Sequence, residues 1–447
     1  MKRFAVLAGL ALAAGSAHGN GRAPLTNGIF FKPGDVQSLY VGTTFGLLIS
    51  HDGGCTMQWV CEANIGFSGT PDPIYAIATD GSIFATTVSG LRISRDGGCS
   101  FQTASTLPAS TWISALDIGP TGEVWVGTAT TGAPNDVYAS TDNGMTFQSR
   151  GMLSPVIWWK SVKVAPSNAM RVYVGGYQVA GMPSDAGVQQ QPAAHIMRSD
   201  DDGTSWTESD ITSFVFGSTP IVLVMAVDPQ NPDIVYAISQ GGNQNRGDIL
   251  YRSADAGGTW TQVLVADESI QNVVITPTTV FVATLIQSGT AYMGGPAYSS
   301  ADHGVTFAPL ANAPQLACLG LRADGALIGC GANWQPDYMS VAKSTDNAMT
   351  WQKVWRFVDL AGPLSCPSGT TEQDTCNLQQ WSTLQQQFGS CGPSCGSSAV
   401  TCSVADAGPP PPKKKSGCCD ASGGAPLGLA WAGALAAWLG RRRRPNT

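Results

Sequence analysis

The aspartate carboxylates are the side chains of this sequence that could most directly catalyse a reaction. Asp136, Asp248 and Asp337 stand in polar stretches that separate short β-rich runs. Two carboxyl groups at a suitable separation can hydrolyse a glycosidic bond, one as acid and the other as base or nucleophile. Nothing in the sequence pairs any two of these three aspartates, so glycoside hydrolysis is one hypothesis among several.

A run of three carboxylates, at residues 200–202, resembles a metal site in composition. A calcium loop needs ligands at alternating positions and a closing glutamate, and the run has neither. The cysteines contain no C-x-x-C pair of the kind that holds zinc. We therefore expect a polar turn at residues 200–202, and neither a metal ion nor a cofactor.

Another set of aspartates lies in a repeated segment, of which "RSADAGGTW" at residues 252–260 is one copy. The pattern S-x-D-x-G-x-T-W places short polar side chains where they can hydrogen-bond the backbone of a tight hairpin, and its glycine tolerates a left-handed conformation. The segment occurs seven times, with Ala348 in place of glycine in the last copy. We interpret its carboxylates as braces of hairpins, not as catalysts: Asp52, Asp96, Asp142, Asp201, Asp255, Asp302 and Asp346.

The spacing of these segments indicates the elements around them. From serine to serine the intervals are 44, 46, 59, 54, 47 and 44 residues, and each interval holds four short β-rich runs bounded by Gly, Pro and Asn. A period in the forties is typical of a four-stranded propeller blade. The sequence therefore predicts an all-β protein, with a seven-bladed β-propeller over residues 24–358 and a short Cys-rich segment after it.

The seven segments resemble Asp boxes, also called BNR repeats, which occur in sialidases, sortilin-type receptors, xyloglucan-cleaving glycoside hydrolases and photosystem assembly factors. This resemblance covers roughly three quarters of the chain. It implies the propeller fold and leaves the function open, because the fold hosts both enzymes and pure binding proteins.

The amino-acid composition limits the cellular compartment and the classes of binding partner that we expect. Of the 447 residues, 43% are hydrophobic and only 12% are charged, with a net charge of −7. A scattered acidic surplus without a basic aromatic platform argues against nucleic-acid binding. Residues 1–19, "MKR" followed by an apolar run and small residues, predict a secretory signal peptide. We therefore expect an exported protein.

The other end of the chain carries a second sorting pattern. A Pro/Lys linker at residues 404–417 precedes Cys418 and Cys419, an apolar stretch at 425–440 and an arginine cluster at 441–444. Residues 418–447 resemble the myxobacterial C-terminal sorting signal, MYXO-CTERM, which implies a transmembrane helix, processing near the cysteines and display on the cell surface. The alternative is that this segment is a plain membrane anchor. Under both hypotheses we expect the propeller outside the cell, where it is anchored or is released after processing.

Twelve cysteines fit an exported protein. Cys318 and Cys330 flank a predicted hairpin centred on Asp324, so an antiparallel pairing places them opposite each other and a disulfide is expected. Residues 359–403 hold five more cysteines and are predicted to form a disulfide-stapled cap or stalk. The sequence leaves their connectivity open, together with that of Cys55, Cys61 and Cys99.

In a four-stranded blade the turn after strand three lies at one end, while the loop between strands two and three and the connection to the next blade lie at the other. Blades four to seven carry insertions in the loop between strands two and three. Because long loops on a rigid scaffold commonly carry function, we expect the ligand there. The candidate binding residues, which Trp158 and Trp159 could join, are Gln190, His195, Asn243, Asn245, Arg246, Asp248, Tyr292, Trp334, Asp337 and Tyr338.

The sialidase resemblance implies three arginines that converge on a substrate carboxylate. The first-blade strand "IFFKP" has Lys32 instead, and Arg246 is the clear arginine on the predicted binding face. The sequence therefore favours a cell-surface propeller that binds a glycan or protein ligand without catalysis. The alternative is a secreted glycoside hydrolase of the sialidase-like or xyloglucanase-like class, and a third hypothesis is a structural envelope component.

Overall fold

The computed structural model describes residues 23–178, 191–244, 247–288, 291–333 and 337–388. The chain divides into two compact units, residues 1–408 and 409–447, and every described residue belongs to the first. The predicted signal peptide at 1–19 and the linker and sorting signal at 404–447 lie outside the described residues. Along the described residues, no helix combines the length and apolar character needed to span a membrane.

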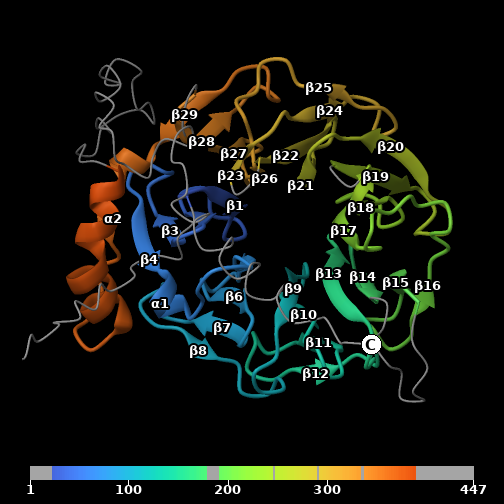
Figure 1. The fold of residues 1–447 in the computed structure, drawn as a ribbon, viewed down its shortest axis with the longest axis horizontal. Coiled ribbons are helices and arrows are strands. Elements are labelled where there is room, and N and C mark those ends of the chain that lie inside the picture. Colours follow the sequence, from blue (N-terminus) through green and yellow to red (C-terminus); the bar gives the residue numbers. More distant parts are fainter. Residues whose placement is uncertain (1–22, 179–190, 245–246, 289–290, 334–336, 389–447) are drawn as a thin grey trace, which may run out of the picture. The chain divides into compact units, whose positions relative to one another are not determined.

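Seven antiparallel sheets of the described chain are arranged around a central axis, as Figure 1 shows, and each is one blade of a β-propeller. Each blade is built on four antiparallel strands in chain order, with the first strand nearest the axis. This confirms the predicted all-β, seven-bladed fold with four-stranded blades. Blades 1 to 3 consist of β1 (Thr26–Phe30), β2 (Leu39–Thr43), β3 (Gly46–Ser50) and β4 (Gln58–Cys61); β5 (Tyr75–Ile77), β6 (Ile83–Thr87), β7 (Gly90–Ser94) and β8 (Gln102–Thr103); and β9 (Ile113–Ile118), β10 (Val124–Thr128), β11 (Val137–Ser140) and β12 (Gln148–Ser149).

Blades 4 to 7 follow the same order, with one additional strand in blade 6, where β23 also pairs with β22. Their strands are β13 (Trp158–Ala165), β14 (Asn168–Gln178), β15 (Ala193–Ser199) and β16 (Thr207–Glu208); β17 (Val222–Val227), β18 (Val235–Asn243), β19 (Gly247–Ser253) and β20 (Thr261–Val265); β21 (Ser269–Ile275), β22 (Val280–Ser288), β23 (Ala291–Gly294), β24 (Tyr298–Ser300) and β25 (Ala308–Pro309); and β26 (Cys318–Leu321), β27 (Leu327–Ala332), β28 (Met339–Ser344) and β29 (Gln352–Trp355).

Polar side chains of the innermost strands join several neighbouring blades. Ser114 Oγ of blade 3 donates to Trp159 O of blade 4 at 2.7 Å. Ser161 Oγ of blade 4 accepts from Val224 N of blade 5 at 2.8 Å. These hydroxyls are buried, so each contact satisfies a backbone group that would otherwise lose its hydrogen bond to water.

The first and last blades each keep their own four strands, and side-chain hydrogen bonds join these two blades where the ring closes. Thr26 Oγ1 in β1 donates to Asn333 Oδ1 at 3.0 Å and lies 3.3 Å from Ser340 O, both in blade 7. The chain then returns to blade 1, where β30 (Gly362–Pro363) adds a parallel fifth strand beside β4. Blade 1 is therefore held from both ends of the described chain.

Residues 357–388 form what we call the C-terminal clasp. It comprises the short helix η1 (Phe357–Asp359), β30, the π-helix η2 (Glu372–Gln380) and α2 (Trp381–Phe388), and it lies along β4 and the four-residue helix α1 (Glu62–Ile65) (Figure 1). The Phe388 ring packs against Phe45 and Phe357, at centroid distances of 5.3 and 5.0 Å. The described part of the segment predicted as a disulfide-stapled cap or stalk thus packs in one hydrophobic cluster with residues of blades 1 and 7.

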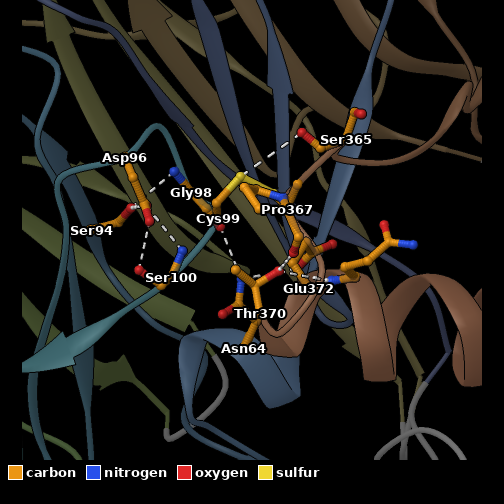
Figure 2. The surroundings of a disulfide bond; sticks show 12 residues. Asn64, Ser94, Asp96, Gly98, Cys99, Ser100, Ser365, Pro367, Thr370 and Glu372 are labelled. Carbon is orange, nitrogen blue, oxygen red and sulfur yellow. Dashed lines mark hydrogen bonds between the residues drawn. A yellow bond between two sulfur atoms is a disulfide. The ribbon is translucent and has the colours of Figure 1, made fainter.

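Three disulfides connect the described cysteines. Cys318 and Cys330 face each other across β26 and β27, which confirms the predicted pair. The other two attach the clasp to blades 1 and 2 and join Cys61 to Cys376 and Cys99 to Cys366. Figure 2 shows the second of these, with the turn of blade 2 on one side and Pro367, Thr370 and Glu372 of the clasp on the other.

The repeated segments are hairpin turns between the third and fourth strands, and we call them the Ser-Asp turns. In blade 5, Ser253 Oγ donates to Asp255 Oδ1 at 2.7 Å and accepts from Gly257 N at 2.8 Å, while Thr259 N and Oγ1 donate to Asp255. Gly257 has φ +85°, a conformation that favours glycine. Ala348 of blade 7 adopts φ +67° and keeps the corresponding bond to Ser344 at 3.0 Å, so this turn is not less braced than the others.

Asp255→Ala is expected to lower the free energy of unfolding by about 1 to 3 kcal/mol, because its carboxylate accepts three hydrogen bonds within one turn. Urea unfolding followed by tryptophan fluorescence measures the loss. Asp210→Ala is the matched control, since exposed Asp210 accepts hydrogen bonds only from Thr212 among the described residues and lies outside the Ser-Asp turns. Equal destabilisation by both substitutions would contradict the role assigned to the turn.

Candidate functional site

Antiparallel order gives the propeller two different faces. We call the end that carries the Ser-Asp turns the turn face, and the opposite end, with the loops between second and third strands and the connections between blades, the loop face. The predicted insertions in blades 4 to 7 do fall between β14 and β15, β18 and β19, β22 and β24, and β27 and β28. Four candidate residues in these loops lie outside the described residues: Gln190, Asn245, Arg246 and Trp334.

His195 was expected in a loop, and the structure corrects this. It lies in β15, opposite Gly176 of β14. Its Nδ1 is 2.6 Å from Glu208 Oε1 of β16, and its partly buried ring faces the outer part of blade 4. The sequence stretch was assigned to a loop because β14 and β15 extend further than the corresponding strands of blades 1 to 3. A strand residue with a partner of its own is a poor ligand for a molecule on the loop face.

The three aspartates proposed for acid–base chemistry have a common structural role instead. Asp136, Asp248 and Asp337 each lie at or just before the third strand of a blade and accept hydrogen bonds from backbone N–H groups. The donors are Val137 and Met152 to Asp136, at 2.8 and 2.9 Å; Gly241 and Ile270 to Asp248, at 2.9 and 2.8 Å; and Gln315 to Asp337, at 3.2 Å.

Asp136 and Asp248 therefore fix the connection that leads to the next blade, and Asp337 fixes the connection that enters its own blade from blade 6. Asp136 and Asp248 are only 2% exposed, and burial raises the pKa of the Asp248 carboxyl. The three residues belong to blades 3, 5 and 7, and each carboxylate is held by the backbone donors of its own surroundings. Asp248 is likewise not available as a loop-face ligand.

The remaining candidates differ in exposure. Asn243 is the last residue of β18, and its Nδ2 donates to Ala266 O at 3.0 Å and to Asp267 Oδ1 at 2.9 Å, so it fastens the loop to the next connection. Tyr292 of β23 and Tyr338 before β28 are 43% and 36% exposed on the loop face. These two tyrosines are the described candidates that remain open to a ligand.

A more compact group of side chains gathers on the loop face between blades 3 and 4. We call Trp112, Trp158, Lys160 and Tyr177 the Trp-Lys cluster. Trp112 directly precedes β9, Trp158 begins β13, and Tyr177 lies opposite Trp158 near the end of β14. The ring of Trp158 lies 6.4 Å from that of Trp112 and 5.5 Å from that of Tyr177, at interplanar angles of 63° and 69°.

Lys160 provides the positive charge of this cluster. Its Nζ lies 3.8 Å from the centre of the Trp112 ring, within the range of a cation–π interaction. Burial lowers the pKa of the Lys160 ammonium to about 8. Trp112, Trp158 and Lys160 all remain partly exposed, so the cluster combines flat apolar surface with an incompletely solvated cation.

Sequence reasoning named Trp158 and Trp159 but missed the other members of the cluster. Trp159 is in fact buried, with Nε1 donating to Met152 O at 2.9 Å. A usable signal was present, because Trp112 and Trp158 both occur where the first strand of a blade begins. Aligning the blades on their first strands brings these two tryptophans together in neighbouring blades.

Three arginines at the ends of third strands act between blades. Arg95, Arg198 and Arg252 each donate to a backbone carbonyl in the Ser-Asp turn of the following blade, at Asn143, Ala256 and His303 respectively. An open depression of about 390 Å³ also lies on the turn face, lined by residues that include Arg95, Asp96 and Met145. These arginines therefore hold the turn face together.

One group of potential metal ligands occurs within the described ranges. It consists of Cys61, Glu372 and Cys376, whose ligand atoms all lie within 4.8 Å of one another. The two cysteines are bonded to each other, and a disulfide lacks the thiolates that bind a metal. The expectation of a polar turn at 200–202 also agrees with the contacts found, since Asp200 pairs with Arg171 and Arg198, and Asp202 with Arg150.

Comparison with known proteins gives likenesses among solved structures, whereas no family model and no curated protein matches the chain. A GH74 enzyme from Niastella koreensis shares 15% identity over 74% of this chain and 65% of its own, with a TM-score of 0.42. A GH74 xyloglucanase from Xanthomonas campestris shares 15% over 74% of this chain and 66% of its own, with a TM-score of 0.40. YCF48 from Cyanidioschyzon merolae shares 13% over 70% of this chain and 94% of its own, with a TM-score of 0.44.

The match spans slightly less than two thirds of the length of each of these two GH74 enzymes. These structural neighbours are propellers. The likeness concerns the fold and says nothing about the activity of this chain.

Proposed function

We propose that this protein is exported, displayed at the cell surface, and serves as a non-catalytic binding module for a glycan or protein ligand. The observation that carries the proposal is the Trp-Lys cluster, where two partly exposed tryptophans gather on the loop face. Amphipathic aromatic side chains are enriched at recognition surfaces, because they provide a large contact area at a low cost in conformational entropy.

The rest of the proposal depends on sequence patterns. The resemblance of the Ser-Asp turns to Asp boxes, the signal peptide at 1–19 and the MYXO-CTERM-like tail support a propeller held outside the cell. Disulfides Cys61–Cys376 and Cys99–Cys366 fit an oxidising compartment. Limited proteolysis of intact cells tests the display: the propeller is expected to be cleaved, and its full protection would contradict an external location.

The alternative function is glycoside hydrolysis, which requires different residues from a binding module. It needs two carboxyl groups across one substrate site, whereas Asp136, Asp248 and Asp337 accept backbone hydrogen bonds in three separate blades. The full-length protein should be tested on a glycan array and, in parallel, with fluorogenic glycosidase substrates. Binding without turnover is expected, and turnover above the buffer rate would overturn the proposal in favour of the enzyme.

Trp158→Ala is expected to weaken binding of an array-identified ligand by about tenfold or more, because partly exposed aromatic anchors dominate binding energy where they engage. Titration calorimetry measures the change. Trp206→Ala is the matched control, since Trp206 follows the Ser-Asp turn of blade 4 on the opposite face and donates to Arg150 O. Loss of affinity in the Trp206 variant alone would place the ligand on the turn face.

A further inference from the structure

The Trp-Lys cluster owes its geometry to an irregularity in β13. Pairing with β14 passes from Trp159 opposite Gly176 directly to Ser161 opposite Gly175, so Lys160 is the extra residue of a β-bulge. A bulge redirects a side chain, and the first strands of blades 1, 3, 5 and 6 carry corresponding register shifts. Both neighbours of Lys160 are fixed, Trp159 by its bond to Met152 O and Ser161 by its bond to Val224 N. The position of Lys160 is therefore set by the connection from blade 3 and by blade 5.

The charge of Lys160 is not balanced within the part of the chain that the structure describes. The ion pairs found there include Lys163 with Asp117 on the same two blades, at 3.6 Å, but none involves Lys160. The nearest described partner is the face of Trp112, which attracts a cation more weakly than a carboxylate does. Burying a cation without a counter-charge costs free energy, and an anionic ligand would offset that cost.

The aromatic rings restrict what else the ligand must contain. With Lys160 over Trp112, the ring of Trp158 adds a second flat surface at a steep angle, and Tyr177 supports it from β14. Such surfaces pack against the apolar face of a compact ring, and polar groups at their rim fix its orientation.

A bound peptide strand is less compatible with this site. β13 is one of the two terminal strands of its sheet, and the backbone edge on which a peptide at this site would pair already bonds to blade 3, with Trp159 O accepting from Ser114 and Val164 N donating to Asp117. The bulge at Lys160 interrupts the regular sequence of backbone donors and acceptors along that edge. The geometry therefore favours a ring-shaped ligand with one negative charge over an extended acidic peptide.

We propose that the Trp-Lys cluster binds a carboxylated sugar, such as a hexuronic acid unit of an acidic polysaccharide, with the sugar ring against Trp158 and its carboxylate at Lys160. This inference rests on the proposed binding function and specifies the ligand class. It assigns Lys160 a binding role that is distinct from that of Lys163, which lies on the same strand but already pairs with Asp117.

Titration calorimetry of the full-length protein with galacturonic acid hexamer tests the inference. We expect the wild type to bind it, and Lys160→Gln to weaken binding by about tenfold or more, because a charge-assisted contact is lost. Lys163→Gln is the matched control and should change the affinity less than about twofold. Circular dichroism confirms that the variants fold.

Neutral cellohexaose and a hexaglutamate peptide distinguish the ligand classes. Failure of the wild type to bind the galacturonate, equal affinity in the Lys160 variant, or tighter binding of either comparison ligand would overturn the inference. Binding of cellohexaose that is independent of Lys160 would do so while leaving the proposed binding function intact. Turnover of glycosidase substrates would instead refute the proposed function itself.

Discussion

Replacing Cys61, Cys376, Cys99 and Cys366 together by alanine is expected to lower the free energy of unfolding by about 8 kcal/mol, roughly 4 kcal/mol for each pair. The two disulfides join residues separated by 315 and 267 positions, so they remove much of the conformational freedom of the unfolded chain. A loss of this size is comparable to the total stability of many domains. The clasp is then expected to detach from blade 1 at moderate urea concentrations.

Urea unfolding monitored by circular dichroism and tryptophan fluorescence measures this loss. The Cys318→Ala/Cys330→Ala variant is the control, because that disulfide spans only 12 positions and should contribute about 3 kcal/mol. If the four-cysteine variant were no less stable than this control, the clasp would not be a main source of stability.

The second prediction concerns Glu372, which the clasp buries completely, at 0% exposure. Its Oε2 accepts from Cys61 N at 3.2 Å and from Asn64 Nδ2 at 3.0 Å, while its buried Oε1 has no hydrogen-bond partner among the described residues. Burial raises the pKa of this carboxyl from its ordinary 4.5 to about 7. The folded protein therefore holds the proton more tightly than the unfolded chain does.

This difference makes the free energy of unfolding depend on pH. The contribution of Glu372 is fully present below about pH 4.5, the value in the unfolded chain, and is lost as the pH rises through about 7. The loss is about 3 kcal/mol. Glu372→Gln keeps an acceptor for Cys61 and Asn64 but carries no charge, so this variant is expected to be more stable than the wild type at pH 8 and less sensitive to pH.

Urea unfolding at pH 5, 6, 7 and 8, values chosen to bracket the shifted pKa, checks this result. Asp374→Asn is the matched control, since Asp374 lies two residues further along η2 with an exposed side chain. The control should retain the wild-type pH dependence. An unchanged pH profile in the Glu372 variant would show that another group is responsible.

Part of the site was predictable because some of its determinants are local. Trp158 was named as a possible ligand-binding aromatic residue in the connection between two blades, and the loops of blades 4 to 7 were correctly placed between second and third strands. The side chains within those stretches were harder to assign. His195 and Asp248 lie in strands with partners of their own, because the length of a strand depends on its neighbours in the sheet.

The sequence alone determined the number and order of the blades, the seven turns and the Cys318–Cys330 disulfide. Each of these depends on short-range geometry: Ser253 bonds to Asp255 and Gly257, two and four residues away, and Cys318 faces Cys330 across a single hairpin. Hydrogen bonds within one turn form wherever the right residue types recur, so the repeat could be recognised from the sequence alone.

Only the tertiary structure decided how the blades are joined and which side chains meet at the boundaries between them. Cys61 meets Cys376 across 315 positions because the chain returns to blade 1, and Lys160 meets Trp112 because a bulge in β13 redirects it toward the neighbouring blade. Such contacts depend on the packing of whole sheets, where a one-residue change in register alters which side chains face each other, and no local pattern records that register.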